Sequence, residues 1–223
     1  MEQILSGHEI RALGCLIEKE LSTPEYYPLT INALMAACNQ KSNRDPVLTL
    51  TEKEVYTAIE QLKGKTLAWQ MNLTGSRVPK FEHNLGPKFG LTQQEISVLC
   101  ALMLHGPLTP GEIRGCSGRL YPFANPEEVQ TTLQALIDNP KGPFVVKLPK
   151  VPGRKEHRFA HLFSRNYDLS QISPISNAEI NSLNETSPVI NDPISSMQEK
   201  IDRLSAELAD LKQAFLNFKN SFD

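Results

Sequence analysis

The sequence predicts a mainly α-helical protein with small β-hairpins, an α+β chain built from two tandem copies of one unit and a C-terminal helix. Three observations predict this architecture: an internal repeat, a change from helical to extended periodicity late in each copy, and a heptad pattern near the C-terminus. The composition agrees, because 40% hydrophobic and 22% charged residues are ordinary for a globular chain of 223 residues.

Four blocks of sequence recur in the same order at offsets of 74 to 86 residues, too many matches in register to arise by chance. The paired blocks are Leu5-Ser6-x-x-Glu9-Ile10 with Leu91-Thr92-x-x-Glu95-Ile96, Pro28-Leu29-Thr30 with Pro107-Leu108-Thr109, Glu54-Val55-x-Thr57 with Glu128-Val129-x-Thr131, and Gly75-x-Arg77 and Phe81-x-His83 with Gly153-Arg154 and Phe159-x-His161. Such repetition predicts two copies of one structural unit.

Each copy opens with three predicted helices, and the starts of the first and third carry helix-start residues. These are Ser6 with Glu9 and Thr92 with Glu95 for the first helices, Thr51 with Glu54 for the third helix of copy one, and Asn125 with Pro126 for that of copy two. Short second helices are expected after each Pro-Leu-Thr, at about 30–38 and 109–116. Gly64 is expected just beyond the end of the third helix, where a left-handed residue often ends a helix.

The periodicity then becomes extended, which predicts a β-hairpin in each copy. The expected strands are residues 67–72 and 78–83 in copy one, and 144–148 and 157–162 in copy two. Three helices followed by a hairpin is the winged-helix order, with the hairpin as the wing. The sequence therefore predicts a first winged-helix domain at 1–88, a second at 89–165, a flexible linker at 166–193 and a coiled-coil helix at 194–223.

The predicted C-terminal helix carries an apolar seam with spacings of three and four residues, the pattern of a coiled coil. The seam consists of Ile194, Met197, Ile201, Leu204, Leu208, Leu211, Phe215, Phe218 and Phe222. Because an exposed apolar stripe is unfavourable in water, we expect a homodimer formed through this helix. The alternative is that the stripe packs on the domains of its own chain.

Several stretches of the two copies resemble the YceH family of bacterial proteins over about residues 4–165. They are Tyr27-Pro28-Leu29, Cys38-Asn39-Gln40-Lys41-Ser42-Asn43-Arg44-Asp45-Pro46, Thr109-Pro110-Gly111-Glu112-Ile113-Arg114, Gly142-Pro143-Phe144-Val145-Val146 and His161-Leu162-Phe163. The resemblance implies two winged-helix domains, in agreement with the repeat, and implies no reaction.

Winged-helix units most often bind duplex DNA, so the leading hypothesis is a DNA-binding protein that acts in transcription or nucleoid organisation. Residues 91–165 carry nine basic against six acidic residues, and cations there favour phosphate contacts. The candidate DNA-binding residues are Lys41, Ser42, Asn43, Arg44, Lys53, Tyr56, Arg77, Lys80, Lys147, Lys150, Arg154, Lys155 and Arg158.

Each group of candidates also has a structural interpretation. The basic hairpin of copy two is equally consistent with a solvated strand edge, and Arg44 beside Asp45 with an internal salt bridge. The third helices begin with acidic residues, and that of copy two offers only amide and hydroxyl groups at Gln130, Thr131 and Gln134. The alternative function is therefore a protein–protein interaction adaptor that binds no DNA.

Catalysis, cofactors and metals are not expected, because the chain has no nucleotide-binding glycine loop, HExxH or nucleophile motif. His83 and His161 occupy matched positions of the repeat, which favours a structural role for both. The four cysteines form no CxxC pair, and no apolar run reaches membrane-spanning length. The N-terminus lacks the features of a signal peptide. We therefore expect a cytoplasmic protein with no membrane partner.

Overall fold

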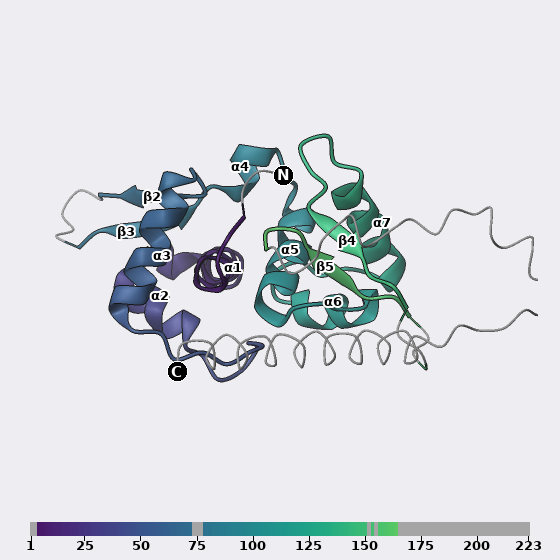
Figure 1. Ribbon diagram of the computed structural model, residues 1–223, viewed down its shortest axis with the longest axis horizontal. Helices are drawn as coiled ribbons and strands as arrows, with labels where there is room; N and C mark the ends of the chain where they lie inside the picture. The colour runs from purple at the N-terminus through teal and green to yellow at the C-terminus, as the bar shows by residue number, and fades with distance from the viewer. Residues whose placement is uncertain (1–3, 73–77, 151–152, 154–155, 165–223) are drawn as a thin grey trace, which may run out of the picture. The chain divides into compact units, whose positions relative to one another are not determined.

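The computed structural model describes residues 4–72, 78–150, 153 and 156–164, all within one compact unit, Met1–Ser173. This part of the chain is a mixed α+β structure with seven α-helices and two small antiparallel sheets (Figure 1). None of the described helices is long and apolar enough to cross a membrane. The predicted linker and coiled-coil seam lie outside the described residues, as do Arg77, Arg154 and Lys155.

The first half of the described chain has three α-helices followed by an antiparallel strand pair. Its elements are α1 (Gly7–Ser22), the short 3-10 helix η1 (Pro24–Tyr26), β1 (Leu29–Thr30), α2 (Ile31–Cys38), α3 (Glu52–Gly64), β2 (Ala68–Met71) and β3 (Lys80–His83). The sheet order is β1-β3-β2, with Leu29 opposite Phe81 and Ala68 opposite His83. Ala68, Phe81 and His83 are buried on the face that packs inward.

The second half repeats this order after the short helix α4 (Leu85–Phe89). Its elements are α5 (Gln93–His105), α6 (Pro110–Ser117), α7 (Pro126–Ile137), β4 (Val145–Lys147) and β5 (Phe159–His161). Strands β4 and β5 pair antiparallel, with Val145 opposite His161. A single bridge between Leu108 and Phe159 occupies the place that β1 takes in the first half.

The predicted helix starts are confirmed, because the side chains of the expected capping residues accept backbone N–H bonds. Ser6, Thr51 and Thr92 each form a capping box with the glutamate three residues later. Thr109 forms a fourth box with Glu112, and Asn125 accepts from the N–H of Glu128. These local bonds explain why the sequence located the helices well.

The predicted end of α3 is wrong in one detail. Gly64 is the last helical residue rather than the left-handed residue beyond it. The left-handed conformation occurs instead at Thr66, with a φ of 55°. Contacts with other segments hold Thr66 there: its carbonyl accepts from Asn84, and its hydroxyl accepts from Lys88. The preference of glycine for this conformation is overridden by these tertiary contacts.

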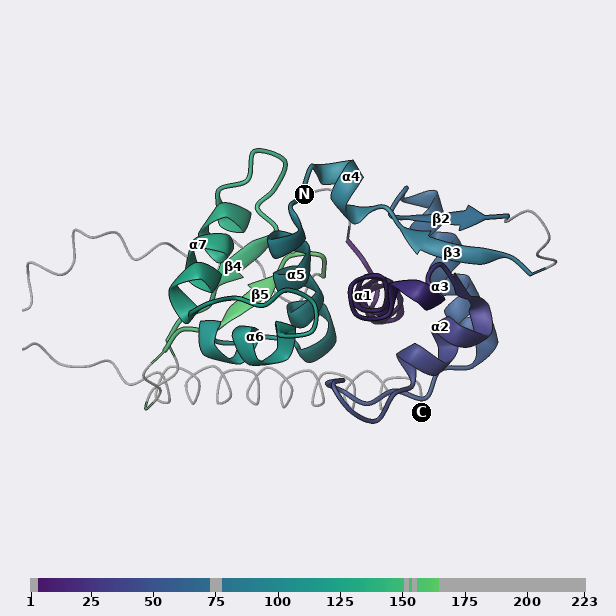
Figure 2. The same ribbon diagram turned by 180° about the vertical axis from the view of Figure 1, so that it is seen from behind.

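The two halves share one continuous apolar core, centred where α1 crosses α5. Figures 1 and 2 both show these helices side by side between the two halves. Gly14 allows the close approach, since a Cβ there would lie 2.9 Å from Leu104 Cδ2, and the Sγ of Cys100 donates to the Gly14 carbonyl at 3.4 Å. The predicted domain boundary after residue 88 falls inside α4.

Candidate nucleic-acid interface

Helix α3 separates an apolar inner face from a polar outer face. Its inner residues, Val55, Ala58, Ile59 and Leu62, are fully or almost fully buried. On the outer face Lys53 is exposed and Tyr56 is 51% exposed. This arrangement presents an ammonium group and a phenol on a helix that is held by the core, and lysine is one of the residue types that contact guanine edges in the major groove.

Helix α7, the equivalent of α3, presents a different outer face. Glu127, Gln130, Thr131 and Gln134 are exposed, and Gln134 donates to the carboxylate of Asp138 at 2.7 Å. No lysine or arginine occurs between Pro126 and Ile137. Both third helices begin with acidic residues, but only α3 also carries lysines, so the two helices are not equivalent as candidate readers.

Arg44 does not lie on the surface, contrary to the expectation that it contacts DNA. Its side chain is fully buried, and its guanidinium donates to both carboxylate oxygens of Glu18, at 2.9 and 2.6 Å, and to the carbonyl of Ala37. The salt bridge is thus made with Glu18 on α1 rather than with the adjacent Asp45. Because the guanidinium is buried and its donors are used inside the protein, Arg44 is no longer a candidate DNA contact.

The Arg44–Glu18 ion pair is strong enough to overcome the cost of burial. Burial disfavours the charged form of each group, yet the hydrogen bonds between them raise the pKa of Arg44 above its ordinary value and lower that of Glu18. A pair of this kind stays charged, and its energy depends on both partners being present. Sequence reasoning missed Glu18, because 26 residues separate it from its partner.

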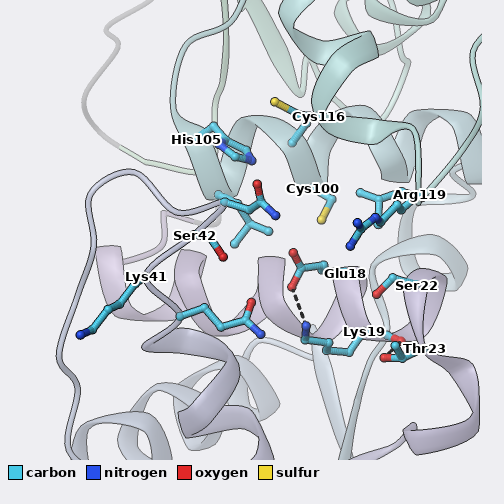
Figure 3. Close-up of a pocket in the computed structure, with 15 residues that line it drawn as sticks. Glu18, Lys19, Ser22, Thr23, Lys41, Ser42, Cys100, His105, Cys116 and Arg119 are labelled. Atoms are coloured by element: carbon cyan, nitrogen blue, oxygen red, sulfur yellow. Dashed lines mark hydrogen bonds and ion pairs between the residues drawn. The ribbon is translucent and has the colours of Figure 1, made fainter.

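The remaining donors of this loop line a polar cleft of about 350 Å³ bounded by α1, α5 and α6 (Figure 3). Lys41, Ser42 and Asn43 are exposed along one wall, and Arg119 lies on the opposite side. The Glu18 carboxylate lies between them, and Lys19 pairs with it at 3.3 Å. The charge at the centre of this cleft is therefore already compensated by the protein.

His105 lines the same cleft, and its pKa reflects burial and the charges around it. Burial lowers the pKa of its imidazole, and the nearby Arg44 cation lowers it further.

The loop that carries Lys41, Ser42 and Asn43 is fixed at both ends. The Asn39 side chain bonds the backbone N–H and carbonyl of Leu50, and the Asp45 N–H donates to the Leu104 carbonyl at 2.8 Å. The cleft therefore has a defined shape in the absence of a ligand.

The cations of the two hairpins differ in their exposure and in their partners within the protein. Lys147 and Lys150 are exposed, and Lys80 is half-buried beside Met71. Arg158 is held against its own half, because its guanidinium donates to the Pro107 carbonyl at 2.6 Å and to Glu112 at 2.8 Å. Lys147 and Lys150 are thus the better placed phosphate contacts in the described part of the second hairpin.

The first hairpin exposes large apolar side chains that sequence reasoning did not select. Trp69 is 44% exposed, Met71 is 36% exposed, and Val78, just before β3, is 50% exposed. Trp69 and Met71 alternate with the inward-facing Ala68, so both lie on the outer face of the sheet. Exposed apolar groups of this size on one small sheet are typical of contact surfaces.

The fold and the candidate surfaces define a class of protein: an α+β chain with two halves of the same element order and no cluster of metal-binding side chains in its described part. A family model described as "Protein of unknown function, DUF480" matches residues 5–154. The chain therefore belongs to this family.

The relatives agree with that assignment along nearly the whole chain. A UPF0502 protein of Vibrio atlanticus is 39% identical over 223 residues, covering 98% of this chain and 97% of the relative. One of Geobacter sulfurreducens is 44% identical over 214 residues, covering 95% and 91%. One of Geotalea uraniireducens is 44% identical over 230 residues and covers both chains completely. The bacterial family expected from the sequence is consistent with these matches.

Proposed function

We propose that the protein binds duplex DNA as a tandem winged-helix protein, with α3 of the first half as the reading helix. In this interpretation α2 and α3 form the helix-turn-helix, and β2 with β3 forms the wing. The observation that carries the proposal is the outer face of α3, which exposes Lys53 and Tyr56 from a helix whose other face is buried in the core.

The second half contributes affinity rather than sequence reading. Its third helix has an acidic and amide face, whereas its hairpin exposes Lys147 and Lys150. Phosphate neutralisation supplies much of the affinity for DNA and carries little sequence information. In this proposal the first half makes the base contacts and the second half makes the phosphate contacts.

The test is binding of the full-length protein to a labelled random duplex, measured by fluorescence anisotropy across a salt series. We expect the affinity to fall steeply with salt, and Lys147→Ala with Lys150→Ala to reduce the log–log slope by about 0.9 per lost phosphate contact. On a preferred sequence selected from the random pool, Lys53→Ala with Tyr56→Ala should weaken binding about tenfold or more. The matched control is Gln130→Ala with Gln134→Ala on α7, which should leave affinity unchanged. Absence of binding at low salt would refute the proposal.

We further propose that the chain forms a homodimer through the heptad seam of residues 194–223. Burial of each Leu or Phe of such a seam contributes roughly 1.5–3 kcal/mol, so nine positions favour association. Light scattering at micromolar concentration should give twice the chain mass for the full protein and one chain mass after removal of 194–223. A single chain mass for both proteins would contradict the dimer.

The exposed first hairpin supports a second candidate function, an adaptor that binds another protein. Trp69 and Met71 are enriched types in the centres of protein interfaces, and neither is needed for phosphate contact. If the wild-type protein binds no duplex even at low salt, the adaptor becomes the better explanation. If the wild-type protein binds duplex DNA and Trp69→Ala abolishes that binding, this hairpin is part of the nucleic-acid interface.

A further inference from the structure

A second cavity, of about 420 Å³, lies on the other side of the α1–α5 crossing, at the N-terminal end of α1. Its walls come from the first turn of α1, residues 45–48, the end of α5, and β5 with the residue Ser164. Most of the lining is apolar, including Ile10, Leu48, Leu102 and Met103. This size and character fall in the range of small-molecule sites, about 300–1,000 Å³.

One wall holds a buried cation, Arg11, whose side chain has no carboxylate within ion-pair distance among the residues that the structure describes. Arg11 is only 3% exposed. Its guanidinium donates to the carbonyls of Cys38 and Pro46, and its Nε has no hydrogen-bond partner within the described part of the chain. Burial, with the nearby Arg44, lowers the pKa of Arg11. A buried charge without a counter-ion is costly.

The neighbouring Arg44 shows what this fold does when it compensates a buried guanidinium itself. Glu18 binds Arg44 with two hydrogen bonds from inside the protein. Among the described residues no carboxylate lies within ion-pair distance of Arg11. Asp45, the one acidic residue lining the cavity, is exposed, and its effect is the smallest of those that raise the pKa of Arg11. This weakly compensated charge beside an open cavity points to a negatively charged group from outside the chain.

A second wall holds His161, which is buried and has an Nδ1 atom without a hydrogen-bond partner among the residues that the structure describes. Burial lowers the pKa of His161 to about 4, so its imidazole is neutral at pH 7 and offers both a donor and an acceptor. Its counterpart His83 is satisfied within the protein, since its Nδ1 accepts from the Leu85 N–H and Glu20 lies against its Nε2. A buried polar atom without a partner is rare in native proteins.

The start of α1 adds a favourable electrostatic environment at the same cavity. The helix has 16 residues, and Gly7 and His8 of its first turn line the cavity. The capping box uses the N–H groups of Ser6 and Glu9, and the Glu9 carboxylate is itself paired with Lys65. The N–H groups of Gly7 and His8, which no carbonyl of the helix can reach, carry partial positive charge. Space around Gly7 is open, because no heavy atom would lie within 4 Å of a Cβ there. Anions bind readily at such helix starts.

We propose that this cavity binds a small organic anion with an apolar body and one carboxylate or phosphate head. The head is directed to Arg11 and the first turn of α1, and the body contacts the apolar walls near Leu102 and Met103. Because residues 45–48 belong to the first half and β5 to the second, the ligand joins the two halves. This inference goes beyond DNA binding and does not depend on it.

The test is isothermal titration calorimetry of the full-length protein, without DNA, with three probes. Octanoate and phenyl phosphate carry the two head groups on apolar bodies, and 1-octanol is the neutral control. We expect at least one of the two anions to bind with one site per chain, and 1-octanol to bind about tenfold or more weakly. Equal binding of octanoate and 1-octanol would show that no anion is recognised and would overturn the proposal.

Inorganic phosphate separates an organic ligand from a bare anion site that takes a free phosphate or a phosphate of DNA. It should bind more weakly than phenyl phosphate, because it makes no apolar contacts. If inorganic phosphate binds as tightly as phenyl phosphate and octanoate does not bind, the organic part of the proposal is wrong. Absence of binding by all of the anions overturns the proposal entirely.

Two variants of one exposed residue locate the site without disturbing the core. His8→Glu places a carboxylate at the cavity mouth in the first helical turn, a position that helices tolerate well, and should weaken anion binding about tenfold. His8→Lys should strengthen it. Lys141→Gln, which removes an exposed cation elsewhere, is the matched control and should change nothing. Identical affinity in the two His8 variants would place the anion outside this cavity.

Discussion

The two halves of the molecule have the same order of elements but differ in the polar side chains that they bury. In α1 the positions of Arg11 and Glu18 correspond, at the offset of 86 residues, to Ser97 and Leu104 in α5. The first half therefore places charges inside the protein, whereas the second buries an almost entirely apolar helix. Repetition conserves the framework of caps and core residues, while the polar interior is specific to each half.

The difference extends to the surfaces that bear on function. Helix α3 exposes Lys53 and Tyr56, whereas α7 exposes Glu127 and amides. Likewise His83 has partners within the protein, whereas the Nδ1 of the matched His161 has none in the described part of the chain. Matched positions in a repeat thus do not imply matched roles, and each half has to be tested by itself.

The largest expected effect comes from breaking the buried ion pair of the first half, Arg44 with Glu18. Glu18→Ala leaves the Arg44 guanidinium buried without its carboxylate and should lower the free energy of unfolding by about 3–5 kcal/mol. Urea denaturation followed by circular dichroism measures this loss. The double variant Glu18→Leu with Arg44→Met should be more stable than Glu18→Ala alone. A loss below about 1 kcal/mol for Glu18→Ala would show that the pair is not buried in solution.

A smaller effect is expected from the histidine that the second half buries. The pKa of His161 is about 4 in the folded chain, below the ordinary value of 6.5 that applies when unfolded. The unfolded state therefore binds this proton first as the pH falls, and stability is lost between about pH 6.5 and 4, by up to about 3 kcal/mol. Above pH 6.5 the residue contributes no pH dependence.

The measurement is the difference between wild type and His161→Gln in the pH dependence of the free energy of unfolding. The variant lacks this titration, so its stability should fall less steeply over the same interval. His8→Gln, which changes an exposed imidazole, serves as the control and should follow the wild type. Parallel curves for wild type and His161→Gln would contradict the burial of His161.

The smallest effect tests the contact that joins the halves. Gly14→Ala puts a Cβ 2.9 Å from Leu104 Cδ2 and 3.2 Å from Met103 Cβ, so the α1–α5 crossing must widen, at a cost of about 1–3 kcal/mol. Gly64→Ala, at the end of α3, meets no atom within 4 Å and should be neutral or stabilising. Thermal unfolding of the two variants gives the comparison. Equal stabilities would mean that the helices do not approach closely at Gly14.

The sequence by itself determined the helix starts, the hairpins and the two-fold repetition. Ser6 with Glu9 and Thr92 with Glu95 are local signals, because a capping box forms between residues three apart whatever the rest of the chain does. Strand periodicity is equally local. The sequence also selected Lys53 and Tyr56 as candidate DNA contacts, and both side chains are exposed.

Only the tertiary structure decided where the polar side chains point and which of them meet. The sequence suggests that Arg44 is a surface cation, but α1 places Glu18 against it in the interior. The left-handed conformation expected at Gly64 occurs at Thr66, because Asn84 and Lys88 hold Thr66 there. The cavity at Arg11 arises from the crossing of α1 and α5, which depends on Gly14. Burial and ion pairing are properties of packed elements far apart in the chain, and no local pattern encodes them.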